Sequence, residues 1–383
     1  MVLLLGGRCG KTRAKGTKTA KPQPRDPWKV AVEEHLAARR AAKPRLPREA
    51  YVTLWWGDTT ARAFDGLVTM VHSLRRFDAR REIVVMTPVP KPVFDRHEES
   101  PPVDPNMQRV LRAFAPMSSV RVPFMTIFRK TKRTCQTIGA CGMGTATSYG
   151  GGRKPSASSG YDSYLFSYTK FALWNLTAFT KLMYIDNDVL VMQPPDGLWA
   201  APLGGRNLAA AALAIKAKTY KGIGEAECNG DGSIPKSVHV GRIKFNAGVH
   251  MIEPSAVLYQ AILKLMNGEW RRNWKTPCAS DQRYFNFLLA ERHTHCWPMS
   301  ANCRDPQFIE REAPPDRLAP VSRLSRCLDS APLSNGSRTT MAVPYMVHMA
   351  CKSKPWLPAN AKTFFAVEWH KRRAEAHVRM RAV

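Results

Sequence analysis

The sequence lacks any run of about 20 apolar residues, the length that a membrane-spanning helix requires, so no transmembrane segment is expected. The apolar stretch at residues 2–5 is too short for the core of a signal peptide. The sequence lacks the dense cysteines of a small disulfide scaffold, because its nine cysteines are about average in number and are scattered over 383 residues. Acidic side chains are also scarce, at 30 against 58 basic ones.

What the chain does contain is enough apolar material for a sizeable core. Hydrophobic residues make up 44% of it, and fifteen Phe, ten Trp and ten Tyr need burial, so the chain is not wholly disordered. Its length suits one large or two ordinary domains. The formal net charge of +28 favours polyanionic partners: nucleic acid, an anionic membrane or phosphorylated small molecules. A basic surface that only confers solubility would give the same charge.

Strand and helix patterns alternate in the first third of the chain. Residues 51–56 are β-rich, residues 64–77 place apolar side chains on one helical face, and residues 82–87 are almost continuously apolar. This order predicts a βαβ unit with a parallel sheet buried on both faces. A helix at 106–114 and a strand at 120–123 continue the pattern. The predicted fold class is therefore α/β with a mostly parallel central sheet.

Composition divides the chain into three parts. Residues 1–49 predict a basic, largely disordered arm that holds one short helix at 28–42; as a basic leader it would alternatively target an organelle. The main domain is expected over residues 50–357, interrupted by a Gly-, Ser- and Thr-rich mobile insertion at 129–160. Residues 358–383 predict a basic helix that docks on this domain, with a membrane-surface role as the alternative.

A strand pattern at residues 181–186 ends in closely spaced carboxylates. Asp186 and Asp188 are two residues apart, and continued strand alternation would point both side chains to one side. Two carboxylates so placed can hold a divalent cation, and the carboxyl ends of strands are where open α/β sheets bind ligands. The alternative is a turn in which these aspartates only cap loop amides.

Two other patterns fail on spacing. Gly10-Lys11-Thr12 resembles the end of a phosphate-binding loop, but the glycine required five residues earlier is Leu5. A second group is rich in zinc-ligand residue types yet fits no standard ligand spacing, and consists of His293, His295, Cys296 and Cys303.

Several blocks along the chain carry a more specific signal. In order, they read YVTLWWGD, HSLRR, EIVVMTP, SYTKFALWNLT, YIDNDVLV, FNAGVHMIEPS, SDQRYFNFLL and VHMACKSKPW. Their order and spacing over residues 50–357 resemble the glycogenin-like members of glycosyltransferase family 8. The resemblance implies a nucleotide-sugar-dependent enzyme with the GT-A fold.

The resemblance also implies roles for individual residues. Asp186, Asp188 and His348 match the family's metal ligands, and two oxygens with one imidazole suit manganese. Lys354 matches a lysine that would contact the donor diphosphate and stabilise the charge of the leaving group. Lys170 matches a donor-contacting lysine, although by itself it would pass as a solvated helix residue.

The remaining implied positions bind the donor. Asn187 and Cys351 belong to the donor-binding blocks, and Asp281 and Gln282 match a pair beside the transferred sugar. The positions that line the uracil, the ribose and the sugar are Leu54, Trp56, Gly57, Asn246 and Ala247. For Trp56, stacking on the base and packing in the core both remain open.

The sequence departs from the family pattern at three places. Cys351 stands where the family has a glycine, so a Cβ occupies a point where backbone approaches phosphate. Cys278 replaces an acid, three residues before the Asp-Gln pair. Residues 291–344 contain no tyrosine, so self-glucosylation of a tyrosine in that interval is not expected.

The function expected from these features is metal-dependent, retaining transfer of a hexose, glucose or galactose, from a UDP-sugar to an acceptor hydroxyl. The acceptor would be a carbohydrate, a lipid or a protein. Whether a carboxylate acts as a covalent nucleophile is left open. The alternatives are a weakly active or inactive donor-binding scaffold, and a basic nucleic-acid-binding protein, although no specific nucleic-acid motif is present. A cytoplasmic location and a homodimer are further expectations.

Overall fold

The computed structural model describes residues 27–41, 48–55, 61–89, 104–123, 125, 168–200, 203, 208–212, 245–267, 294–297, 303–304, 346–348 and 364–383. Its helices are α1 (Pro27–Ala41), α2 (Ala61–Arg75), α4 (Pro105–Ala113), the 3-10 helix η1 (Tyr168–Asn175), α6 (Asp196–Trp199), α7 (Ala256–Asn267) and α12 (Phe364–Arg381). Its strands are β1 (Glu49–Leu54), β2 (Glu82–Val89), β3 (Met117–Pro123), β4 (Lys181–Ile185), β5 (Val189–Val191), β6 (Leu208–Ala212), β7 (Phe245–Ile252), β8 (Thr294–Trp297), β9 (Cys303–Arg304) and β10 (Met346–His348).

The described strands form one large sheet and one small one. The large sheet has seven strands in the order β3-β2-β1-β4-β7-β6-β8, and its first four strands are parallel. β7 runs antiparallel to both β4 and β6, which places its first residues beside the carboxyl end of β4. The small sheet has the order β5-β10-β9 and follows directly from β4 through β5. The prediction of an α/β fold with a mostly parallel central sheet is confirmed.

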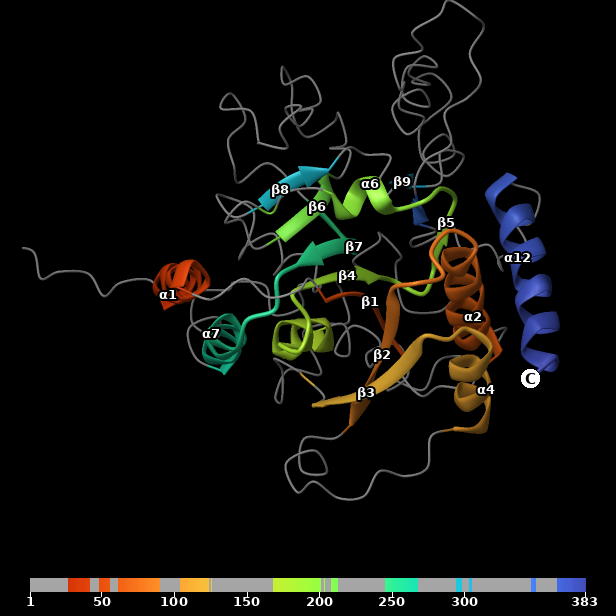
Figure 1. The fold of residues 1–383 in the computed structure, drawn as a ribbon, viewed down its shortest axis with the longest axis horizontal. Coiled ribbons are helices and arrows are strands. Elements are labelled where there is room, and N and C mark those ends of the chain that lie inside the picture. Colours follow the sequence, from red (N-terminus) through yellow and green to blue (C-terminus); the bar gives the residue numbers. More distant parts are fainter. Residues whose placement is uncertain are drawn as a thin grey trace, which may run out of the picture.

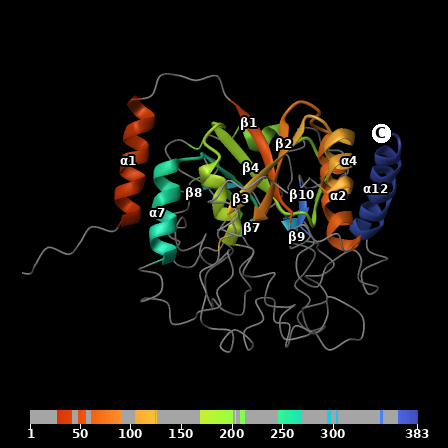
Figure 2. The ribbon, with the colours of Figure 1, turned by 90° about the horizontal axis from the view of Figure 1, so that it is seen from below.

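Side chains on the parallel strands alternate between two buried layers. On β1, Tyr51 packs with α2 and α4 on one face, while Val52 packs with η1 and α7 on the other. Met183 and Tyr184 on β4 divide in the same way. Figures 1 and 2 show the sheet between these two sets of helices. A strand buried on both faces reads as a continuous apolar run, and this explains the pattern at residues 82–87.

Helix starts and packing follow from local sequence. The carboxylate of Asp104 accepts hydrogen bonds from the backbone N–H groups of Asn106 and Met107, and Pro105 occupies the first turn of α4, so this helix begins where the sequence predicts. Residues 168–175 form the 3-10 helix η1, and residues 168–174 are all buried.

The terminal helices pack on opposite sides of the molecule. α1 lies against α7, and α12 lies against α2 and α4 (Figure 1). The docking predicted for the last helix is therefore observed. Within the described residues, no helix is both long and apolar enough to cross a membrane. The division into an arm, a main domain and a terminal helix stays a prediction, and the insertion expected at 129–160 lies outside the described residues.

Candidate active site and metal centre

The site begins at the carboxyl end of β4. The strand ends at Ile185, and residues 186–188 form a turn in which the backbone N–H of Val189 donates to the carbonyl of Asp186, at 3.1 Å. The backbone N–H of Asp186 donates to the carbonyl of Gly248 on β7, at 2.8 Å. The two carboxylates therefore face the same space because of this turn. Strand alternation, on which the sequence argument relied, is not the cause.

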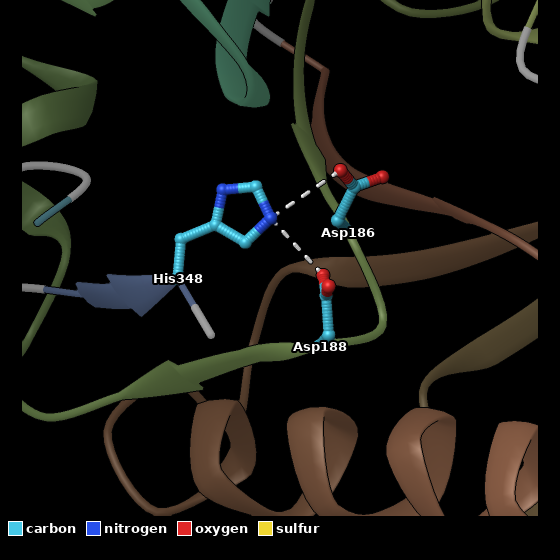
Figure 3. A group of neighbouring side chains, drawn as sticks. All are labelled: Asp186, Asp188 and His348. Carbon is cyan, nitrogen blue, oxygen red and sulfur yellow. Dashed lines mark ion pairs between the residues drawn. The ribbon is translucent and has the colours of Figure 1, made fainter. Parts of the chain in front are cut away.

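His348 reaches the two aspartates through the small sheet. β10 pairs antiparallel with β5, and the register places His348 opposite Val189, next to Asp188 in the chain. The imidazole Nε2 lies 3.2 Å from Asp188 Oδ1 and 3.8 Å from Asp186 Oδ2. Figure 3 shows both carboxylates directed at this nitrogen. The structure thus brings His348 to two aspartates that precede it by about 160 residues, and the ligand atoms of all three lie within 4.8 Å of one another.

Asp186 is held from its other side by two buried residues. Lys170 on η1 is 7% exposed, so it is not a solvated helix residue, and its Nζ lies 2.9 Å from Asp186 Oδ1. The hydroxyl of Tyr184 donates to the same oxygen at 2.7 Å. Burial raises the pKa of Asp186, but the charges of Lys170 and His348 outweigh it. With the hydrogen bond from Tyr184 added, this pKa lies below its ordinary value and the carboxylate is ionised.

A buried histidine lies behind this pair. The ring of His250 on β7 stacks on Tyr184 at 5.0 Å between centroids, and its Nδ1 is 3.1 Å from the carbonyl oxygen of Ala247, to which it donates in the matching tautomer. Burial lowers the pKa of His250 to about 3, and the positive charge of Lys170 adds to the effect. The imidazole is therefore neutral near pH 7. The sequence argument did not single out His250.

Two glycines, which the sequence analysis also did not single out, leave room for the imidazole of His348 and for the carbonyl of Asn187. A Cβ on Gly248 would lie 2.2 Å from the Cε1 of His348, so the ring packs directly on β7 backbone. A Cβ on Gly66 of α2 would lie 2.8 Å from the carbonyl oxygen of Asn187. Gly248 belongs to the quoted FNAGVHMIEPS block, which was a usable signal. For Gly66, a glycine within a helical pattern was the only signal.

The other expected site residues fall into two groups. Leu54 ends β1 and is 2% exposed, Ala247 is buried on β7, and Asn246 precedes it on the same strand. Those that lie outside the described residues are Trp56, Gly57, Asp281, Gln282, Cys351 and Lys354.

The donor set fits a divalent cation. Two carboxylates and an imidazole are ligands that manganese accepts. The 3.2 Å between His348 Nε2 and Asp188 Oδ1 is close to the separation of neighbouring donors around a six-coordinate ion, about 3 Å. The side chain of Asp188 is only 10% exposed, so a carboxylate left there without a cationic partner would be costly. Asp186, Asp188 and His348 are thus the residues that could hold a metal.

The chain resembles a known protein family in sequence. The sequence model described as Glycosyl transferase family 8 matches residues 121–359. No curated protein matches the chain.

The chain is also similar to several solved structures. The galactosyltransferase LgtC, in complex with donor and acceptor sugar analogs, is 15% identical, with a TM-score of 0.49 over 85% of this chain and 95% of LgtC. GlyE of Streptococcus pneumoniae TIGR4 is 14% identical, with a TM-score of 0.47 over 87% of this chain and 63% of GlyE. Mouse xyloside xylosyltransferase 1 is 11% identical, with a TM-score of 0.44 over 80% of this chain and 98% of the mouse chain.

Proposed function

We propose, from the premise that this chain belongs to glycosyltransferase family 8 and is a glycosyltransferase with the GT-A fold, that it moves a hexose from a UDP-sugar to an acceptor hydroxyl. The proposed donors are UDP-glucose and UDP-galactose, the proposed outcome is retention of anomeric configuration, and the proposed metal is manganese. The acceptor is a hydroxyl of a carbohydrate, a lipid or a protein.

The convergence of Asp186, Asp188 and His348 carries this proposal. His348 is distant in the sequence from the two aspartates, and all three side chains are less than a quarter exposed. A manganese ion bound there would neutralise charge on the donor diphosphate as the sugar leaves. A nucleoside diphosphate at the carboxyl end of β4 also agrees with the position of ligands in other open α/β sheets.

The chain's own residues supply the remaining chemistry. Lys170 keeps Asp186 ionised through its ion pair, and its ammonium is near enough to this carboxylate to face a bound diphosphate as well. The resemblance to the family further assigns Lys354 to the diphosphate, and Asp281 and Gln282 to the neighbourhood of the anomeric carbon.

The test is manganese-dependent turnover of a panel of UDP-sugars by the full chain, monitored as release of UDP. Asp188→Asn and His348→Ala should each lower turnover about 100-fold or more, because a loss of transition-state charge stabilisation of about 2.7 kcal/mol corresponds to that factor. Asp196→Asn is a matched control, since Asp196 is exposed on α6 and pairs with Arg81, away from the site.

Two outcomes would change the proposal. Turnover that is equal in wild type and Asp188→Asn would remove Asp188 as a metal ligand. Binding of UDP without release of sugar from any donor would favour the donor-binding scaffold, for which the replacement of a family glycine by Cys351 is the motivating feature.

A further inference from the structure

Helix α12 lies beyond the family match, which ends at residue 359. Its buried residues recur at helical spacing and form one face, made of Ala366, Trp369, Arg372, Ala376 and Met380. Figures 1 and 2 show this helix alongside α2, and α2 also contacts β5. The family pattern gives no role to this part of the chain, yet it is packed into the same body.

Trp369 packs directly on β10, which carries His348, and on β5, which begins immediately after Asp188. It is 2% exposed and forms its own buried cluster with Leu190 of β5 and Val347 of β10. These two partners lie opposite each other in the β5–β10 pairing. Leu190 follows Asp188 by two residues, and Val347 immediately precedes His348. Because successive strand side chains point to opposite faces, the face of β10 that carries Val347 meets Trp369 and the other face presents His348.

A second contact links α12 to the turn between β4 and β5. Asp65 on α2 forms ion pairs with Arg373 and His377 of α12, each at 2.7 Å. The next residue, Gly66, is the one that approaches the Asn187 carbonyl so closely that a Cβ would not fit. Helix α12 therefore fixes the part of α2 on which the 186–188 turn rests.

We infer that α12 belongs to the scaffold of the metal site and that Trp369 is a positioning residue for Asp188 and His348. β5 and β10 are only three residues long, so few ladder hydrogen bonds hold them in place. The indole fills the space behind both strands. Removing it leaves a cavity into which the strands can relax, and residues that orient metal ligands typically change metal affinity 10–100-fold when lost. The expected change in Mn²⁺ affinity rests on the proposed function, but the packing of Trp369 on Leu190 and Val347 does not.

The test compares Trp369→Ala and Trp369→Phe with Met380→Ala in the full chain. Met380 is a large buried side chain at the other end of α12 and lies outside the cluster of Trp369, Leu190 and Val347. Its own larger cluster reaches the opposite face of β5 and β10 through Val189, Val191 and Met346. Calorimetry with Mn²⁺ alone should give at least tenfold weaker binding for Trp369→Ala and a smaller loss for Trp369→Phe. Met380→Ala should bind as the wild type does, although it too lowers the unfolding temperature.

Backbone hydrogen exchange provides a readout that needs no metal. Exchange across residues 189–191 and 346–348 should accelerate in both Trp369 variants and stay at the wild-type rate in Met380→Ala. If wild type fails to bind Mn²⁺, the proposed metal is wrong, and exchange alone decides the positioning role. If Met380→Ala matches the Trp369 variants in exchange, or if wild type binds Mn²⁺ and Trp369→Ala binds equally well, the inference is overturned. Should Trp369→Ala fail to fold, the same comparison is made with Trp369→Phe.

Discussion

At the scale of single residues, the two aspartates of the site have different surroundings. Asp186 contacts the ammonium of Lys170 and accepts a hydrogen bond from the hydroxyl of Tyr184, whereas Asp188 Oδ1 lies 3.2 Å from His348 Nε2. Asp186 is consequently fixed before any cation arrives, since two neighbours already orient its oxygens. The position of Asp188 also depends on β5, which follows it directly, and on β10, which carries His348.

Tyr184→Phe tests how Asp186 is fixed. The change removes the 2.7 Å hydrogen bond to Asp186 but keeps the ring that stacks on His250. Because hydrogen-bond partners of metal ligands are worth 10–100-fold in metal affinity, we expect about tenfold weaker Mn²⁺ binding by calorimetry. Tyr259→Phe makes the same chemical change at a buried position on α7 and should leave Mn²⁺ affinity unchanged. Equal affinities in all three proteins would contradict an orienting role for the hydroxyl.

His250 predicts a pH dependence of stability. Its pKa is about 3 in the folded state against an ordinary value of 6.5, so below pH 6.5 the unfolded chain binds a proton that the folded chain does not. The free energy of unfolding should therefore fall as pH decreases from 6.5 towards 3. Between about pH 7.5 and 5.5 this amounts to about 1.4 kcal/mol.

Urea unfolding at those two pH values measures the effect. His250→Gln keeps a polar side chain that does not titrate, so its free energy of unfolding should fall by about 1.4 kcal/mol less than that of wild type over the same interval. Parallel pH dependences in the two proteins would mean that His250 binds its proton equally in the folded and unfolded states.

At the scale of elements, the site depends on close approach between backbones and side chains. β7 meets His348 at Gly248, and α2 meets the 186–188 turn at Gly66. A glycine within a strand normally weakens it, so alanine at position 248 would be harmless or stabilising if nothing lay above it. The 2.2 Å between the added Cβ and His348 Cε1 reverses that expectation, since the neighbouring atom belongs to a rigid, 6% exposed side chain.

Gly248→Ala should therefore destabilise the protein by on the order of 1–3 kcal/mol, the usual cost of overpacking. A double-mutant cycle with His348→Ala isolates the cause, because truncating the imidazole removes the atoms that the new Cβ would meet. The cost of Gly248→Ala, measured by thermal unfolding, should largely disappear in the His348→Ala background. A cost that is the same in both backgrounds would mean that the strand itself, and not the ring, requires glycine.

At the scale of the whole molecule, the sequence revealed the layers better than the site. The apolar runs at 82–87 and 181–185 are long enough to signal strands buried on both faces, and the large sheet follows from them. The pairing of β5 with β10 is different: both strands have three residues, too few for a period, and they lie more than 150 residues apart in the sequence. Only the family resemblance placed His348 beside the aspartates. Trp369 and His250 act through packing, and Tyr184 acts through its hydrogen bond to Asp186; no local pattern records these contacts.

The net charge of +28 is compatible with two functions, catalysis at the site and general binding of polyanions. The two differ in salt dependence. Attraction to the phosphates of a DNA duplex falls about a thousand-fold or more between about 50 and 200 mM salt when many contacts are made. Interactions within a partly buried site are screened much less. Turnover of the UDP-sugar should accordingly change less than about tenfold over this range.

The Asp186→Asn/Asp188→Asn double variant completes this prediction. It should lose manganese-dependent release of UDP while retaining the salt-sensitive binding of a short DNA duplex, measured by fluorescence anisotropy, because the two substitutions make the chain more basic. If turnover survived the double substitution, or fell with salt as steeply as DNA binding does, catalysis would not reside at the carboxyl end of β4. A steep loss of DNA binding in the double variant would instead mean that DNA binds at Asp186 and Asp188, because a more basic chain should not bind DNA more weakly.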